Sequence, residues 1–294
     1  MAETNILSGK VVSDAVYAAL ENRITTLVDH HSVVPGLAAV IVGDDPASQV
    51  YVRNKTRTFL DMNLHSETIR LPEETSQQEL VSTIRTLNND PVFHGILVQL
   101  PLPKHIDTDE VINAIAPEKD VDGFHPESLG RLTAGNPRFI PCTPKGIMRI
   151  LEHYHMDSSG KHAVVLGRSN IVGRPMSILL SQKQEYSNAT TTICHSGTSD
   201  LRSMTTQADI LVAALGVPEM IDDSYIKEGV VIIDVGINRV PDESEKGYKL
   251  VGDVNFDAVQ GIAQSITPVP GGVGPMTIAM LVENTVEAAE RLFS

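Results

Sequence analysis

Three side chains that could move a proton are spaced along one predicted helix. Ser48, Tyr51 and Lys55 are three and four residues apart, which places them on one helical face. A hydroxyl, a phenol and an amine in one row can form a hydrogen-bonded relay for general acid–base chemistry. A solvated surface is the alternative interpretation, because Arg53 and Arg57 are neighbours and helical lysines are usually exposed.

Polar side chains also interrupt two otherwise apolar or turn-forming segments. Gln99 lies near the end of the apolar run Gly95–Leu100, and ligands of parallel sheets gather at such strand ends. It could therefore orient a lysine or a substrate, or instead bond a loop. Asp120 and Asp122 precede Gly123, and a carboxylate there could pair with an amidine-like ring edge. An ordinary Asp-Gly turn is the alternative.

A third feature is a glycine turn that follows a short apolar run. The turn begins at Gly167–Ser169 and continues to Gly173, which is typical of a strand, a turn and a helix N-terminus that face a phosphate. The full Gly-x-Gly-x-x-Gly pattern is absent. The next run, Thr190–Cys194, is followed by a histidine and a serine, and no acid is present to hold the ribose hydroxyl of NAD. Arg168 nearby favours the 2′-phosphate of NADP, although a turn that binds nothing has the same pattern.

Two glycine-containing segments near the C-terminus could approach a ligand through their backbone. Asp234–Asn238 ends an apolar run and contains Gly236, which suits close approach of a flat cofactor ring. The glycines of Pro270–Gly274 lie between prolines and form a rigid turn that a ligand could contact. Tight structural turns are the alternative for both.

Composition narrows the class of protein. The chain has 294 residues, of which 41% are hydrophobic and 20% charged, as in an ordinary globular protein. The net charge of −14 opposes a nucleic-acid partner. No apolar stretch reaches the roughly 20 residues that span a bilayer, and the N-terminus lacks a secretory pattern. Two cysteines and scattered histidines give no metal-ligand spacing, so we expect a cytoplasmic enzyme without a metal.

Alternating helical and strand patterns predict an α/β fold with largely parallel sheets. Strands are expected at 37–42, 65–71, 95–100, 163–166, 190–194, 210–215 and 230–235. Helices are expected at 47–62, 76–88 and about 276–293, and one more ends near residue 154. The second begins with Ser76 and Glu79 in a capping-box pattern.

These motifs, in this order, resemble the bifunctional methylenetetrahydrofolate dehydrogenase/methenyltetrahydrofolate cyclohydrolase family. The segment Pro268–Thr277, combined with Tyr51 and Lys55, is its most specific part. The matching segments cover nearly the whole chain: Ser48–Lys55, Gly95–Pro103, Asp120–Gly123, Pro141–Gly146, Gly167–Gly173, Asp234–Arg239 and Thr267–Thr277. The resemblance favours chemical roles for Lys55 and for the Asp-Gly loop.

The resemblance implies an enzyme of one-carbon metabolism, which also serves purine biosynthesis. It would oxidise 5,10-methylenetetrahydrofolate to the 5,10-methenyl form with NADP and hydrolyse that product to 10-formyltetrahydrofolate. Hydride transfer needs two apposed rings and no obligatory base, whereas hydrolysis needs proton movement. The implied catalytic residues are Lys55, Tyr51, Gln99 and Asp122.

The resemblance also implies two sets of binding residues. The folate substrate would contact Ser48, Tyr51, Val98, Gln99, Leu100, Asp122, Pro270, Gly271, Gly272, Val273 and Gly274. The cofactor would contact Gly167, Arg168, Ser169, Val172, Gly173, Ser196, Gly236 and Ile237. Gly197 departs from the pattern, since many relatives carry a lysine or arginine there, and this leaves Arg168 as the main partner of the 2′-phosphate.

We therefore expect two α/β domains with an active-site cleft between them. Residues 1–140 would form the catalytic, folate-binding domain, joined by the C-terminal helix 276–294. Residues 141–275 would form a Rossmann-like NADP-binding domain with a parallel sheet. The relatives imply a homodimer, with no membrane or nucleic-acid partner. Another NAD(P)-dependent amino-acid or hydroxy-acid dehydrogenase and a non-catalytic nucleotide-binding module are the rival functions.

Overall fold

The computed structural model describes residues 3–244 and 247–293, and the chain divides into two compact units. The six-stranded unit contains the segment up to Asp14 and Thr143–Thr277, and the three-stranded unit contains Ala15–Cys142 and the chain from Ile278 onward. The expected first domain began at residue 1, but the N-terminal segment belongs to the other unit. The reason is β1 (Asn5–Ile6), which pairs in parallel with β11 (Ser265–Ile266).

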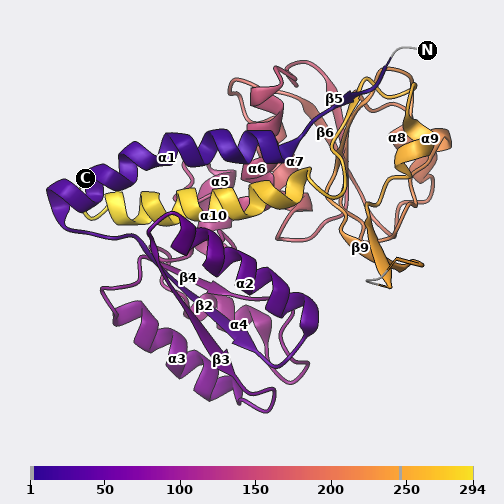
Figure 1. The fold of residues 1–294 in the computed structure, drawn as a ribbon. Helices are drawn as coiled ribbons and strands as arrows, with labels where there is room; N and C mark the ends of the chain where they lie inside the picture. Colours follow the sequence, from indigo (N-terminus) through magenta and orange to yellow (C-terminus); the bar gives the residue numbers. More distant parts are fainter. Residues whose placement is uncertain (1–2, 245–246, 294) are drawn as a thin grey trace. The chain divides into compact units, whose positions relative to one another are not determined.

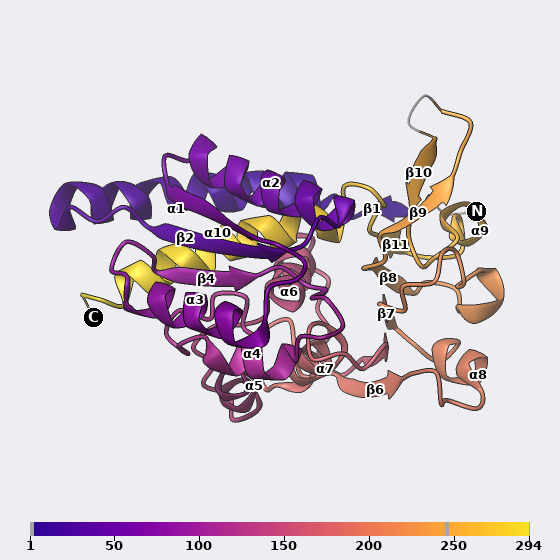
Figure 2. The same cartoon turned by 90° about the horizontal axis from the view of Figure 1, so that it is seen from below.

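The three-stranded unit is built on a parallel sheet in the order β3 (His65–Leu71), β2 (Gly36–Val42), β4 (Gly95–Val98). The central strand β2 is buried along its whole length, as its continuous apolar sequence predicts. One face of the sheet packs on α3 (Gln77–Asn89) and α4 (Thr108–Ala114). The helix α2 (Pro46–Asp61) packs on β2 and β3, and Figure 2 shows it on the other side of the sheet.

Local capping signals fix where two of these helices begin. Asp45 accepts a hydrogen bond from the Ser48 N–H at 2.7 Å, and Pro46 occupies the first turn of α2. The predicted capping box of α3 is confirmed, because Ser76 and Glu79 bond each other's backbone N–H groups. The start of α2, and with it the phase of its side chains, is therefore encoded locally.

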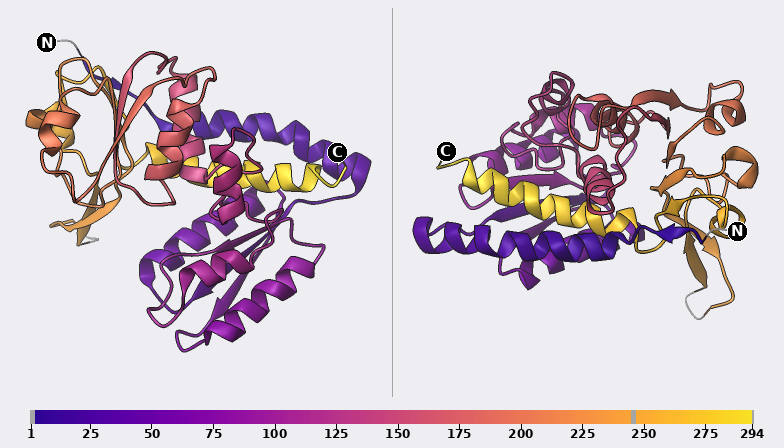
Figure 3. Two further views of the ribbon diagram at one scale, coloured as in Figure 1. Left: turned by 180° about the vertical axis from the view of Figure 1, so that it is seen from behind. Right: turned by 90° about the horizontal axis from the view of Figure 1, so that it is seen from above.

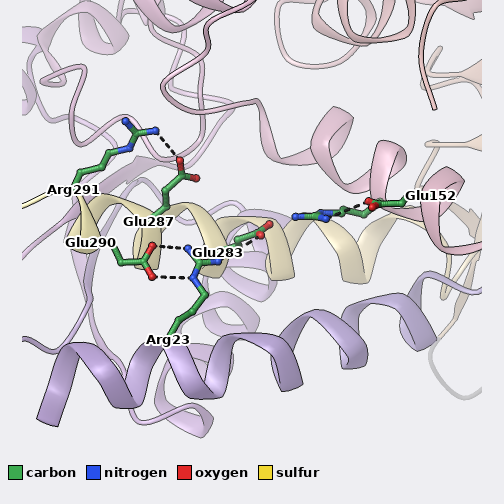
Figure 4. Close-up of polar contacts among 7 residues, drawn as sticks. Arg23, Glu152, Glu283, Glu287, Glu290 and Arg291 are labelled. Carbon is green, nitrogen blue, oxygen red and sulfur yellow. Dashed lines mark hydrogen bonds and ion pairs between the residues drawn. The ribbon is translucent and has the colours of Figure 1, made fainter. Parts of the chain in front are cut away.

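Two long helices lie side by side in this unit, α1 (Gly9–His31) and α10 (Val273–Glu290) (Figures 1 and 3). Arg23 of α1 donates two hydrogen bonds to Glu290 of α10, at 2.9 and 2.6 Å, and lies 3.7 Å from Glu283 (Figure 4). This bidentate arginine–carboxylate pair fixes the register of the two helices.

The six-stranded unit contains a sheet in the order β1-β11-β8-β7-β5-β6, with every pair parallel. Its other strands are β5 (His162–Leu166), β6 (Thr190–Cys194), β7 (Ile210–Ala213) and β8 (Val231–Asp234). Since β5 lies between β6 and β7, the chain reverses its direction across the sheet there. Open parallel sheets bind ligands at such a switch point.

Helices and a hairpin complete the six-stranded unit. One face of its sheet packs on α8 (Leu201–Thr205) and α9 (Phe256–Val259), and α7 (Gly173–Ser181) packs on β5 and β6. The strands β9 (Asn238–Pro241) and β10 (Tyr248–Val251) form an antiparallel pair, visible in Figure 2 beside β8.

The remaining described helices are α5 (Pro126–Thr133), α6 (Cys142–His153) and the short turn η1 (Asp223–Tyr225). Within the described residues, no helix combines the length and the apolar character that crossing a membrane requires.

Candidate active site

Lys55 lies on α2 with only 8% of its surface exposed, and its ammonium donates to the Gln99 side-chain oxygen at 3.2 Å. Gln99 follows β4 directly, and its backbone N–H extends the ladder by donating to Val40 at 2.9 Å. The side-chain nitrogen of Gln99 donates to the Leu100 carbonyl at 2.7 Å, which turns its oxygen toward Lys55. The solvated-surface interpretation of Lys55 is therefore wrong.

The other two members of the predicted row differ in exposure. Ser48 is buried, whereas Tyr51 is 39% exposed. The difference arises because α2 presses Val52 and Phe59, both fully buried, against the sheet, and Tyr51 lies to the side of that contact. The phenol ring is thus partly accessible, beside a buried hydroxyl and a buried amine.

The two carboxylates of the Asp-Gly loop have different surroundings. Asp120 is buried and accepts hydrogen bonds from the Phe124 and His125 N–H groups, at 3.1 and 2.9 Å, and from the Ser128 hydroxyl at 2.6 Å. Burial raises the pKa of Asp120 to about 6, although these hydrogen bonds oppose the shift. Asp120 therefore organises the loop and the start of α5.

Asp122 is half-buried and faces different groups. Burial raises its pKa, while the positive charge of Lys55 and a hydrogen bond from the Cys142 thiol act in the opposite direction. The structure therefore brings Lys55, Gln99 and Asp122 into one cluster. Cys142 is a buried thiol, and its sulfur also lies 3.5 Å from the Val121 carbonyl oxygen.

Sequence reasoning missed one residue that contacts this cluster. Asn284 of α10 is fully buried, and its amide donates to the carbonyls of Val121 and Ile140 at 2.7 and 3.1 Å. The available signal was a lone amide in a helix whose neighbouring residues are largely apolar.

In the six-stranded unit, the glycine turn after β5 is packed so closely that side chains are excluded. Gly167 has a φ of +116°, and a Cβ there would lie 2.4 Å from the Ala214 carbonyl oxygen. A Cβ on Gly173 would lie 2.1 Å from the Gly167 oxygen. Ser169 accepts the Val172 N–H at 3.1 Å just before α7 begins. This close approach of backbone to a helix N-terminus fits a dinucleotide phosphate.

The residues that would meet a 2′-phosphate lie at the neighbouring strand ends. Leu166 pairs with Cys194, so Arg168 and the turn after β6 share one edge of the sheet. Arg168 and Ser196 are exposed, and within residues 3–244 and 247–293 no ion pair is formed by Arg168. In the turn itself, the Gly197 N–H donates to the His195 ring at 3.0 Å. The turn His195–Thr198, directly after β6, contains no carboxylate, which fits NADP.

Two buried carboxylates organise the next strand ends. Asp253 accepts hydrogen bonds from three successive N–H groups, those of Leu215, Gly216 and Val217, at 2.5, 2.9 and 3.1 Å. Asp234 accepts the N–H of Asp253 at 2.9 Å. Burial raises the pKa of Asp234 to about 7. These bonds fix the loop that follows β7.

The packing of Asp253 accounts for a glycine at position 236. A Cβ on Gly236 would lie 2.3 Å from the Asp253 carboxylate, so any larger residue would displace that carboxylate. The next residue, Ile237, is 42% exposed, and a Cβ on Gly274 would lie 3.5 Å from its side chain. The Pro270–Gly274 turn is therefore close to Ile237 within the six-stranded unit.

Sequence profiles of known families match both parts of the chain. The catalytic domain of tetrahydrofolate dehydrogenase/cyclohydrolase matches residues 7–122, and the NAD(P)-binding domain of the same family matches residues 141–293. The chain belongs to the tetrahydrofolate dehydrogenase/cyclohydrolase family. This membership removes the rival functions, a different dehydrogenase class and a non-catalytic nucleotide-binding module.

Individual relatives agree over the full length. The bifunctional protein FolD of Chlorobium phaeobacteroides is 54% identical over 294 residues, 98% of each chain. The crystal structure of the bifunctional FolD enzyme from Campylobacter jejuni has a TM-score of 0.92 and 45% identity, and covers 98% of this chain and 99% of that one. The Trypanosoma brucei enzyme, complexed with NADP and an inhibitor, has a TM-score of 0.94 and 37% identity, with 100% and 99% covered.

The residues expected of a tetrahydrofolate dehydrogenase/cyclohydrolase fall into two clusters. Ser48, Tyr51, Lys55, Val98, Gln99, Leu100 and Asp122 belong to the three-stranded unit. The cofactor residues and the Pro270–Gly274 turn belong to the six-stranded unit. Among the described residues, no group of three or more metal-binding side chains is arranged to hold a metal ion.

Proposed function

We propose that Lys55, held by Gln99, is the proton-transferring group of this methylenetetrahydrofolate dehydrogenase/methenyltetrahydrofolate cyclohydrolase. The enzyme oxidises 5,10-methylenetetrahydrofolate with NADP and hydrolyses the methenyl product to 10-formyltetrahydrofolate. The observation that carries the assignment is the buried Lys55–Gln99 hydrogen bond with Asp122 nearby. A buried amine with one fixed partner can hold and release a proton at a defined place.

The folate would be held by the surroundings of Lys55. The ionised Asp122 carboxylate can accept two parallel hydrogen bonds from the amidine-like edge of the pterin ring. The positive charge of Lys55 and the Cys142 thiol favour that ionised form, against burial. The partly exposed ring of Tyr51 can pack against the folate, with Ser48, Val98 and Leu100 beside it.

The dehydrogenase reaction needs little from ionisable side chains. Loss of a hydride from the methylene carbon leaves a cation that two nitrogens share, so no base is required. The bound NADP accepts that hydride. Gly167 and Gly173 form the closely packed turn. The residues that would hold NADP are Gly167, Arg168, Ser169, Val172, Gly173, Ser196, Gly236 and Ile237. The Pro270–Gly274 turn would contact the folate.

The cyclohydrolase reaction needs three proton movements. Water adds to the methenyl carbon and loses a proton. The bond from that carbon to one ring nitrogen then breaks as the nitrogen gains a proton, and the hydroxyl loses its remaining proton as it becomes the formyl carbonyl. Lys55 would accept the first proton and supply the second, and Gln99 would keep its amine in place between the two steps. One proton is released overall, because the methenyl group is a cation and the formyl product is neutral at that group.

We also propose that the enzyme is a cytoplasmic homodimer. Resemblance to the family supports the dimer, and the free thiols of Cys142 and Cys194 suit a reducing compartment. Light scattering coupled to gel filtration should give twice the mass of one chain, and a monomer mass would contradict the proposal.

The test of the central assignment is Lys55→Met. We expect cyclohydrolase turnover to fall by about 10²- to 10⁴-fold, the range for loss of a general acid or base, with NADP binding unchanged. Arg57→Met is the matched control, because Arg57 lies on the same helix in an exposed ion pair with Asp61. Hydrolysis at the wild-type rate in Lys55→Met would overturn the assignment.

A further inference from the structure

A buried amide on α10 connects the two chain segments on either side of the folate-binding carboxylate. Asn284 is fully buried, and its two N–H bonds are directed to the carbonyls of Val121 and Ile140. Its nitrogen also lies 3.7 Å from the sulfur of Cys142. The segments that contain these partners are separated by about twenty residues along the chain, and the α10 side chain joins them.

Both segments determine where Asp122 lies. Val121 precedes Asp122 directly, and the single S–H of Cys142 is within hydrogen-bonding reach of both the Val121 carbonyl and Asp122 itself. The two segments are in close contact, since a Cβ on Gly123 would lie 2.7 Å from the Pro141 nitrogen. A shift of either segment would therefore displace Asp122.

The opposite end of the loop is fixed independently. Asp120 accepts the N–H groups of Phe124 and His125, which follow Asp122. Asp122 thus lies on a short loop whose one end is held by Asp120 and whose other contacts are held by Asn284. Tight control of a binding carboxylate is expected where it must form two hydrogen bonds to one ring edge.

We propose that Asn284 is a positioning residue for the folate, which fixes Asp122 by joining the Val121 and Ile140–Cys142 segments. The proposal rests on the proposed function, since it takes Asp122 to be the pterin-binding carboxylate. Asn284 touches no substrate atom and acts only through these two segments. The next residue, Thr285, is also fully buried, but its hydroxyl bonds only the Leu281 carbonyl of its own helix.

The test compares Asn284→Leu with the matched variant Thr285→Val. Leucine has the same branching and the same number of side-chain heavy atoms as asparagine, although it is bulkier, and it lacks the donors, so two buried carbonyls lose their partner. We expect the KM for methylenetetrahydrofolate and for the methenyl substrate to rise about tenfold, because a small displacement of a binding group has effects of this order or larger. The KM for NADP should change less than twofold. Thr285→Val should leave all three constants near the wild-type values.

The second variant, Asn284→Asp, adds a readout that a merely structural role would not change. Its ionised carboxylate would face the two carbonyl oxygens, whereas the protonated form can donate one hydrogen bond. The folate KM of this variant should therefore fall toward the wild-type value as pH is lowered from 8 to 6, measured relative to wild type at each pH. If Asn284→Leu does not fold, this variant alone decides.

The outcomes separate the two hypotheses. A folded Asn284→Leu enzyme with the wild-type folate KM would overturn the positioning role, and so would equal increases in the KM for folate and for NADP. A pH-independent folate KM in Asn284→Asp, relative to wild type, would overturn it as well. Failure of the proposed function is seen separately, because Asp122→Ala would then leave the folate KM at the wild-type value.

Discussion

Replacing Arg168 by alanine should weaken the preference for NADP over NAD. Arg168 is exposed at the carboxyl edge of the six-stranded sheet, and the following strand ends in a turn without a second cation. Its guanidinium can form two hydrogen bonds to a phosphate dianion, which neither NAD nor an alanine side chain permits. The loss should therefore affect one cofactor only.

The size of this effect depends on how far Arg168 is exposed to solvent. A hydrogen bond to a charged group contributes about 1.5–3 kcal/mol, but exposed ion pairs contribute only about 0.2–1 kcal/mol. A partly screened, bidentate contact lies between these two ranges, at about 1.4 kcal/mol, which corresponds to a change of roughly tenfold in the ratio of kcat/KM for the two cofactors. The effect should shrink as salt is added, because screening acts on exposed charges.

Initial-rate measurements with NADP and with NAD, at low and at physiological salt, give this ratio directly. Arg174→Ala is the control, since Arg174 lies at the start of α7, directly after the turn, and bonds Asn170 at 2.7 Å. Gly197→Lys should act in the opposite sense and raise the ratio, because a Cβ there meets only the His195 ring, at 3.1 Å. An unchanged ratio in Arg168→Ala would refute the argument and place recognition of the 2′-phosphate elsewhere.

Three further predictions concern glycines and a buried acid. Gly173→Ala should raise the KM for NADP at least tenfold and lower the free energy of unfolding by about 2–3 kcal/mol, since its Cβ would lie 2.1 Å from the Gly167 oxygen. Cofactor kinetics measure the KM and a urea titration measures the free energy of unfolding, and unchanged values would contradict the prediction. Gly130→Ala, inside α5 with nothing within 4 Å of the added Cβ, should instead raise the free energy of unfolding by about 0.5–1 kcal/mol, and a loss in the same titration would be contrary. Because burial raises the pKa of Asp120 from 3.8 to about 6, the folded state holds its proton more tightly, so its contribution to stability is complete below pH 4 and is lost as pH rises to about 6. The stability of wild type should therefore fall across that window by about 3 kcal/mol more than that of Asp120→Asn, and parallel pH profiles of the two would count against this cause.

The regular core of the fold could be predicted from sequence because its signals are local. The strands at 65–71 and 190–194 have the predicted bounds. The strand expected at 95–100 ends at Val98, although the Gln99 N–H still donates a backbone hydrogen bond to Val40. The capping box placed the start of α3 correctly.

Elements that depend on distant partners could not be predicted. β1 is only two residues long and exists because β11, about 260 residues later, offers a free edge. The helix α1 was missed, because its apolar residues are shared between two packing surfaces and form no single stripe. The strands β9 and β10 have four residues each, and their alternation of partly buried and exposed side chains is too short to be recognised as a strand pattern in the sequence.

The residue types of the candidate site could be predicted from the sequence, but the burial of each side chain and the contacts that hold it could not. Helical spacing alone could not tell that Lys55 would be buried and Tyr51 exposed, because that depends on how α2 lies on the sheet. Nor could spacing separate Asp120, which holds the loop, from Asp122, which faces Lys55. Spacing also gave no sign that Asp253 packs against Gly236 and excludes a side chain there.

The pairing of β1 with β11 has a consequence for synthesis on the ribosome. Neither unit is encoded by one continuous stretch: the six-stranded unit needs the first residues and those up to 277, and the three-stranded unit needs residues from 278 onward. β1 emerges from the ribosome about 260 residues before its partner β11, and Arg23 emerges 267 residues before Glu290. A nascent chain therefore cannot finish the six-stranded unit before β11 or the three-stranded unit before the end of α10 has been made, so the two units must mature nearly together.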